Sequence, residues 1–105
     1  MKIPIRRAIA WFYDQLVQLA PTLGARIGRA AAVAEVHGPD AGLALLDEID
    51  LGTATIYQPY WAVRAHLLAR AGRLGEARAC YRRAIGLSED PAVRTFLAQR
   101  SPAGE

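Results

Sequence analysis

The side chains that could bind a metal or act as a nucleophile are few and scattered in this 105-residue sequence. The two histidines are His37 and His66, and the single thiol is Cys80. A zinc site needs three or four ligands, and a nucleophilic cysteine needs a base or a helix N-terminus that lowers its pKa. The spacing meets neither condition. We therefore expect no metal, no cofactor and no enzymatic activity, and we interpret Cys80 as a packed thiol.

The charged residues indicate binding rather than catalysis. Asp47, Glu48 and Asp50 form an acidic cluster typical of a solvated helix face, and no Ser–His–Asp spacing accompanies it. The formal net charge is only +3, so direct DNA binding is not expected as the main function. Contact with a nucleic-acid backbone stays as an alternative, through the arginines of one predicted helix: Arg73, Arg78, Arg82 and Arg83.

Arg64 lies within an otherwise apolar helical pattern. A buried guanidinium without a partner would be costly. One hypothesis is that Arg64 forms an ion pair with Asp47 or with Asp14. The alternative is that its aliphatic stem lies along the helix edge while its charged end stays in water.

The elements that must position these residues are predicted to be helices. Apolar residues recur every three or four positions, and no stretch alternates as a strand would. Prolines and glycines interrupt the pattern, and Thr22 is suited to cap the second helix. The sequence predicts an all-α fold of about six helices, at about 4–21, 22–37, 39–49, 59–71, 74–87 and 90–100. Residues 50–58 are predicted to be a loop.

The length of the chain is typical of a single domain, here 1–105. No apolar run approaches the roughly 20 residues that a membrane helix needs. A lone cysteine and the lack of a signal-peptide pattern favour a reducing, cytoplasmic location.

An internal repeat organises the predicted helices. Gly38 and Gly72 are 34 positions apart (72 minus 38), and an alanine precedes each glycine by seven residues, Ala31 and Ala65. After allowing for one missing residue behind Gly38, three further pairs match: Gly42 with Ala77, Leu46 with Tyr81, and Ile49 with Ala84. The pattern predicts two antiparallel helix hairpins, 22–50 and 58–88, which follow a half repeat at 4–21 and precede a C-terminal helix at 90–100.

Small residues at regular positions explain how such hairpins could pack. We expect Ala65 and Ala77 to meet where the two helices of one hairpin cross, Tyr81 to fill the space one turn further on, and the glycines to form the turns. The expected packing residues are Ala31, Gly38, Trp61, Ala65, Gly72, Ala77, Tyr81 and Ala84.

This pattern resembles the tetratricopeptide repeat, whose signature positions match Trp61, Ala65, Leu68, Gly72, Leu74, Ala77, Tyr81 and Ala84. The resemblance implies a right-handed stack of antiparallel helix hairpins. It also implies a partner-binding groove along the first helix of each repeat, here lined by Ala25, Arg29, Ala32, Glu35, Ala62, His66 and Ala69.

A narrower resemblance covers about residues 9–100, with "AVAEVHGPDAGLALLD" as its most specific stretch. The chain is similar to the tetratricopeptide-like C-terminal extension of one group of bacterial extracytoplasmic-function sigma factors. That resemblance implies a non-enzymatic regulatory domain that contacts sigma regions, RNA polymerase or a partner protein during transcription initiation. The promoter-binding helices of that group do not occur in these residues, and Gly28 stands where the family pattern has Asn. A stand-alone tetratricopeptide scaffold is the other alternative.

The first predicted helix carries an apolar block, Trp11, Phe12 and Tyr13. Only one face of that helix can pack onto its own domain, and exposed apolar patches mark interfaces. We therefore expect this block to form a homodimer contact or to dock onto sigma regions.

Overall fold

The computed structural model describes residues 4–103, which form seven helices and no strand. In chain order they are α1 (Ile5–Leu19), α2 (Leu23–His37), α3 (Pro39–Asp47), α4 (Leu51–Ala54), α5 (Gln58–Arg70), α6 (Leu74–Leu87) and α7 (Pro91–Arg100). The prediction of an all-α fold is confirmed. The prediction of a loop at 50–58 is wrong in part, because α4 forms one short turn of helix within it.

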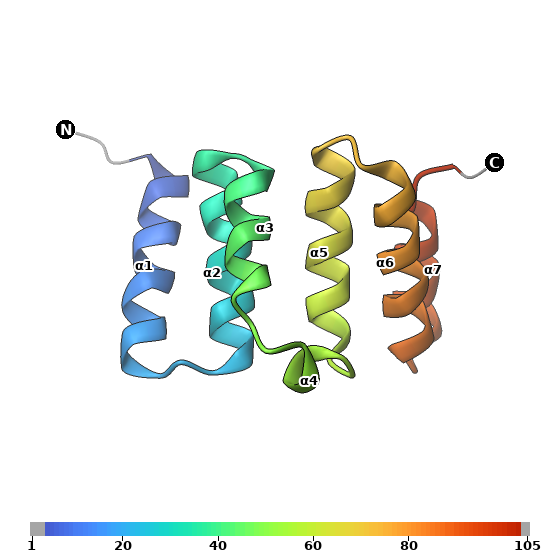
Figure 1. Ribbon diagram of the computed structural model, residues 1–105, viewed down its shortest axis with the longest axis horizontal. Helices are drawn as coiled ribbons and strands as arrows, with labels where there is room; N and C mark the ends of the chain where they lie inside the picture. Colours follow the sequence, from blue (N-terminus) through green and yellow to red (C-terminus); the bar gives the residue numbers. More distant parts are fainter. Residues whose placement is uncertain (1–3, 104–105) are drawn as a thin grey trace.

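The long helices lie side by side and alternate in direction (Figure 1). Helices α2, α5 and α7 run one way, and α1, α3 and α6 run the other way. Along the chain, α1 packs on α2, α2 on α3, α5 on α6 and α6 on α7. The two hairpins α2–α3 and α5–α6 meet where α5 contacts both α2 and α3. The result is an elongated row, 46 Å long and 25–27 Å across.

Local sequence signals set the helix ends. The Thr22 hydroxyl accepts a hydrogen bond from the Ala25 amide at 3.1 Å and so caps α2. The Asp90 carboxylate caps α7 in the same way, accepting from the Ala92 amide at 2.8 Å. Gly38 and Gly72 have positive φ angles of 94° and 82°, which lets the chain turn sharply after α2 and after α5.

One core runs through both hairpins, and it includes four of the expected packing residues: Ala65, Ala77, Tyr81 and Ala84. Ala65 and Ala77 are both fully buried. Trp61 lies at the edge of this core, where its indole N–H donates to the Thr55 carbonyl at 3.0 Å. Two small alanines therefore lie inside the hairpin and a large ring closes one end of it.

The prediction that Ala31 packs inside the hairpin is wrong. Ala31 is half-buried, and the fully buried residue is Ala30, one position earlier. Burial in the two hairpins matches at an offset of 35 residues: Ala30 with Ala65 (65 minus 30), Gly42 with Ala77 and Leu46 with Tyr81. The two turn glycines are offset by only 34 (72 minus 38), so they are not equivalent positions and misplace the first helix by one residue.

Candidate functional site

The candidate site is a pocket of about 230 Å³ between the three helices that run in the same direction. Its walls come from α2, α5 and α7, and α6 contributes one residue. The lining residues are Ala31, Ala62, Val63, His66, Tyr81, Phe96, Leu97 and Arg100. Six of these eight side chains are apolar or aromatic. The other two are His66 and Arg100, which are basic.

Small residues on α2 and α5 leave the space that makes the pocket. Ala31 and Ala62 carry only a methyl group and stand on neighbouring helices. Tyr81 is 4% exposed, so its side chain is part of the core as well as of the pocket lining. Burial raises the pKa of the Tyr81 hydroxyl, while the charge of Arg100 acts to lower it. The hydroxyl is therefore neutral at physiological pH.

Helix α7 supplies the most exposed part of the pocket. Leu97 is buried and anchors the helix, whereas the neighbouring Phe96 is 53% exposed. The Arg100 guanidinium lies 4.8 Å from the centre of the Phe96 ring, in a cation–π contact. An aromatic ring held in place by an arginine at a pocket mouth offers both apolar contact and a positive charge.

Sequence reasoning placed the groove on α2 and α5 and missed α7. The missing signal was available in the spacing of Phe96, Leu97 and Arg100, which brings them to one side of a helix. Helix α7 also packs on α6 and runs parallel to α2 and α5.

The expected groove residues divide into three sets. Ala62 and His66 line the pocket. Ala25 and Ala32 are buried, and Ala69 is half-buried against the core, so the expectation that these alanines form an open groove surface is wrong. Arg29 and Glu35 are occupied by ion pairs within the chain.

These ion pairs link α2 to its two neighbours α1 and α5. The Arg29 Nε donates to Asp14 of α1 at 2.7 Å. Glu35 of α2 lies 3.6 Å from Arg70 of α5 and 3.9 Å from Arg6 of α1. Both charges expected to be free for a partner are therefore already engaged, and they hold α1, α2 and α5 together.

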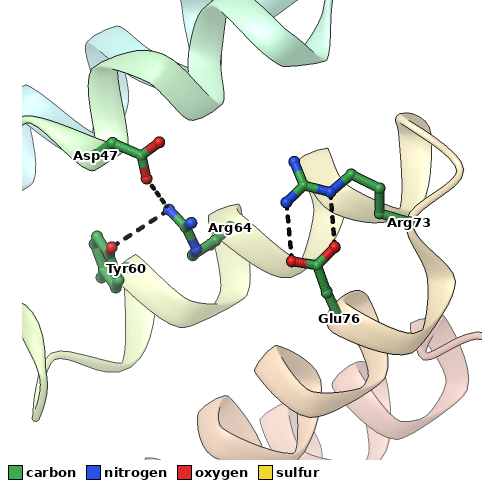
Figure 2. Close-up of polar contacts among 5 residues, drawn as sticks. All are labelled: Asp47, Tyr60, Arg64, Arg73 and Glu76. Atoms are coloured by element: carbon green, nitrogen blue, oxygen red, sulfur yellow. Dashed lines mark hydrogen bonds and ion pairs between the residues drawn. The ribbon is translucent and has the colours of Figure 1, made fainter.

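Arg64 lies on another side of α5 from the pocket and pairs with one of its two expected partners. Figure 2 shows its guanidinium between Asp47 of α3 and Tyr60, with N–O distances of 2.9 Å and 3.5 Å. The expectation that this ion pair is buried is wrong, because the Asp47 side chain is 63% exposed. Asp14 binds Arg29 instead.

The pKa of Arg64 reflects this position. Partial burial acts to lower it, but the hydrogen bond to Asp47 and the charge interactions with Tyr60 and Asp47 outweigh burial and raise it. Arg64 is charged at every physiological pH. Its role is to connect α3 with α5, the second helix of one hairpin with the first helix of the next.

The arginines expected for nucleic-acid contact are largely used within the protein. Arg73 makes two hydrogen bonds to Glu76, at 2.7 and 2.9 Å (Figure 2). Arg78 donates to the Ala103 carbonyl at 3.1 Å. Arg83 donates to the Thr55 hydroxyl at 2.9 Å and lies 5.2 Å from the centre of the Trp61 ring. The Arg73 pair is local to the start of α6 and neutralises that charge, whereas the contacts of Arg78 and Arg83 tie α6 to other segments and occupy part of each guanidinium.

The apolar block on α1 is only partly exposed. Trp11 and Phe12 are 63% and 56% exposed. Tyr13 turns toward α2, where its ring occupies the space that a side chain on Gly28 would need, so its assignment to an exposed interface patch is wrong. Ile5, Ile9 and Leu19 are exposed on the same helix.

No cluster suited to a metal ion is found within residues 4–103. Cys80 is buried, and burial raises the pKa of its thiol. The thiol is therefore protonated at neutral pH and packs as a small apolar group. None of the helices described has the length and apolar character to span a membrane.

Comparison with known proteins gives one curated relative, an uncharacterized protein of Rhizobium meliloti (strain 1021). It is 31% identical over 85 residues, which cover 81% of this chain. The matched part spans 20% of the relative's own length. No family model matches the chain. No solved structure matches it either.

Proposed function

We propose that this chain is a non-enzymatic protein-interaction domain that regulates transcription initiation, with a tetratricopeptide-like stack as its fold. The fold proposal is supported by the offset of 35 residues at which burial repeats between the two hairpins. It is also supported by α7, which lies against α6 and runs parallel to α2 and α5, as the first helix of a third repeat would.

The pocket carries the functional proposal. It opens between first helices of successive hairpins, and the exposed Phe96 ring stands in its wall. Exposed aromatic residues beside an apolar recess are typical of protein-binding surfaces. The absence of a catalytic constellation among the pocket residues, which include one histidine and no carboxylate, favours binding over chemistry.

The sigma regions or the polymerase are the partners that the sequence resemblance favours. In this proposal the domain binds a segment of one of them in the pocket and so changes how readily initiation occurs. Contact of an arginine-rich helix with nucleic acid is the weaker proposal, because Arg73, Arg78 and Arg83 are engaged within the chain.

The test compares two exposed apolar residues, one inside and one outside the pocket. Phe96 lines the pocket, whereas Leu74, at the start of α6, is 45% exposed and does not. Phe96→Ala is expected to weaken association with purified sigma regions or polymerase by about tenfold, the usual cost of losing a central aromatic contact. Calorimetric titration against each partner measures this effect.

Leu74→Ala is the matched control and is expected to leave association unchanged. Two results would contradict the proposal: no association of the unmodified chain with either partner, or equal losses in the two variants. Circular dichroism of both variants checks that the helices remain folded.

A further inference from the structure

We propose that the pocket between α2, α5 and α7 recognises an aromatic or large aliphatic side chain that is accompanied by a carboxylate, within an acidic segment of a protein partner. This inference deepens the proposed function and rests on it for the nature of the occupant. The occupant is a segment of a protein, and the size, lining and charge of the pocket determine which side chains it accepts.

The size of the pocket fits one side chain. Its volume is about 230 Å³, whereas sites for drug-sized ligands and cofactors occupy roughly 300–1,000 Å³. An apolar cavity of about 150 Å³ is known to accept benzene. A single six-membered ring with its connecting methylene therefore matches the space, whereas a nucleotide or a larger cofactor would extend beyond it.

The lining selects an apolar group for the interior. Ala62, Val63 and Leu97 are aliphatic, and the Phe96 ring is available for an edge-to-face contact with a second ring. No backbone turn or carboxylate contributes to this lining. A polar side chain placed among these aliphatic walls would lose hydrogen bonds to water, for which only the Tyr81 hydroxyl and the His66 ring offer replacements.

The charge at the pocket selects an anion beside that apolar group. Arg100 lines the pocket and lies against the Phe96 ring rather than against a carboxylate. Within residues 4–103, the ion pairs of the structure leave Arg100 without an acidic partner. Its charge also acts on the hydroxyl of Tyr81, another residue of the pocket lining.

The acidic group nearest to this region along α2 cannot replace a partner's carboxylate. Glu35 follows the pocket residue Ala31 by one helical turn, and it is already shared between Arg70 and Arg6. A guanidinium on a ring face keeps its N–H groups free at its edge, where they can donate two hydrogen bonds to one carboxylate. An incoming cation would instead be repelled.

The experiment uses three probes that differ in one group: 3-phenylpropionate, 3-phenylpropionamide and 3-phenylpropylamine. Each is titrated into the whole chain while backbone amide resonances of α5 and α7 are followed by NMR. The acid is expected to bind about fivefold more tightly than the amide, as one charge-assisted contact at a half-exposed site provides, and the amine is expected to bind least.

Variants of Arg100 separate charge from shape. Arg100→Gln should abolish the preference for acid over amide, and Arg100→Lys should retain part of it. Arg82 is an exposed arginine of α6 outside the pocket, so Arg82→Gln is the matched control and should keep the full preference. Equal binding of acid and amide, a preference that survives Arg100→Gln, or no shift in the pocket resonances with any probe would each overturn the inference.

A capped peptide that contains Asp next to Phe provides the second arm, compared with its Asn–Phe counterpart. A preference for the Asp peptide supports a protein segment as the source of the chemistry. If only the free aromatic acid binds, the pocket takes a small molecule and the commitment to a protein segment is wrong. These results are independent of association with sigma regions or polymerase, so the failure of this inference and the failure of the proposed function can be told apart.

Discussion

The hairpins α2–α3 and α5–α6 use the same buried positions but fill them differently. At the crossing of the second hairpin, Ala77 of α6 is fully buried. At the equivalent position of the first hairpin, Gly42 leaves no room even for a methyl group: a Cβ there would lie 2.6 Å from the Ala30 carbonyl oxygen. One turn further on, Leu46 replaces Tyr81. The two hairpins therefore share the positions at which their helices touch, while the separation between the helices depends on the residue at each contact.

The turns of the two hairpins also differ. Gly38 ends α2 and directly precedes Pro39, the first residue of α3, so one glycine serves both helix ends. The second turn uses Ala71, Gly72 and Arg73, and the Arg73 amide donates to the Leu68 carbonyl at 2.9 Å. That bond closes α5 in the manner of a Schellman motif. The first hairpin is therefore tighter both at its crossing and at its turn.

Gly42→Ala is expected to have the largest effect. The added methyl group would overlap the backbone of Ala30 and the side chains of Ala34 and Leu67, and a backbone oxygen cannot move aside cheaply. We expect a loss of about 2–4 kcal/mol in the free energy of unfolding, measured by urea denaturation.

Gly86→Ala is the matched control for that variant. Gly86 is also within a helix, but nothing lies within 4 Å of a Cβ built there. Alanine is the better helix former, so this variant should be stabilised by about 0.5–1 kcal/mol. If the two variants changed stability by the same amount, the close approach of α2 and α3 would be refuted.

Much of the fold follows from local signals in the sequence. Pro21, Thr22 and the two turn glycines act on their own neighbours, so the breaks between helices could be located without knowledge of packing. Helix α4 could not be predicted in this way, because it is a single turn after Asp50 with no apolar period of its own. Helices that short depend on the surrounding structure.

The alignment of α2 with α5 could not be predicted from the turn glycines, although the alignment of α3 with α6 could. Gly38 and Gly72 suggest an offset of 34, but their turns differ by one residue, so burial follows an offset of 35 and selects Ala30 rather than Ala31. The same limit applies to the pocket. The helix position predicts His66 and Ala62, whereas the spacing of Phe96 and Arg100 marks only one face of α7, and the packing of α7 against α6 decides where that face lies.

The two turn glycines provide the second prediction. Gly38 has φ 94° and ψ 164°, a backbone region that is essentially restricted to glycine. Gly38→Ala should therefore lower the free energy of unfolding by about 2 kcal/mol. Gly72 has φ 82° in a turn of the left-handed type. Its replacement by Ala should therefore lower the free energy of unfolding by only about 1 kcal/mol. No atom lies within 4 Å of a Cβ at either glycine, so backbone strain alone is tested. A larger loss at Gly72 than at Gly38 would show that the first turn is not the tighter one.

A smaller effect than at either turn glycine is expected at the contact between the hairpins. Asp47→Ala removes the ion pair of Arg64 and leaves the guanidinium with the Tyr60 hydroxyl at 3.5 Å. Because the Asp47 carboxylate is 63% exposed, we expect a loss of about 0.5–1 kcal/mol in the free energy of unfolding, near the upper end for solvent-exposed pairs. Chemical denaturation at low and high salt measures it, and the loss should shrink as salt increases.

Replacing Arg64 itself separates the charge from the packing of its stem. Arg64→Met keeps an apolar stem of similar length on α5 and removes the charge together with the cost of its desolvation. It should therefore lower the free energy of unfolding by less than Asp47→Ala does, or not at all. Glu76→Ala, which breaks the exposed pair within the first turn of α6, should have a smaller effect than Asp47→Ala because it joins no two helices. If Arg64→Met were the most damaging of the three, Arg64 would support the junction between α3 and α5 through contacts other than the pair with Asp47, such as its hydrogen bond to the Tyr60 hydroxyl.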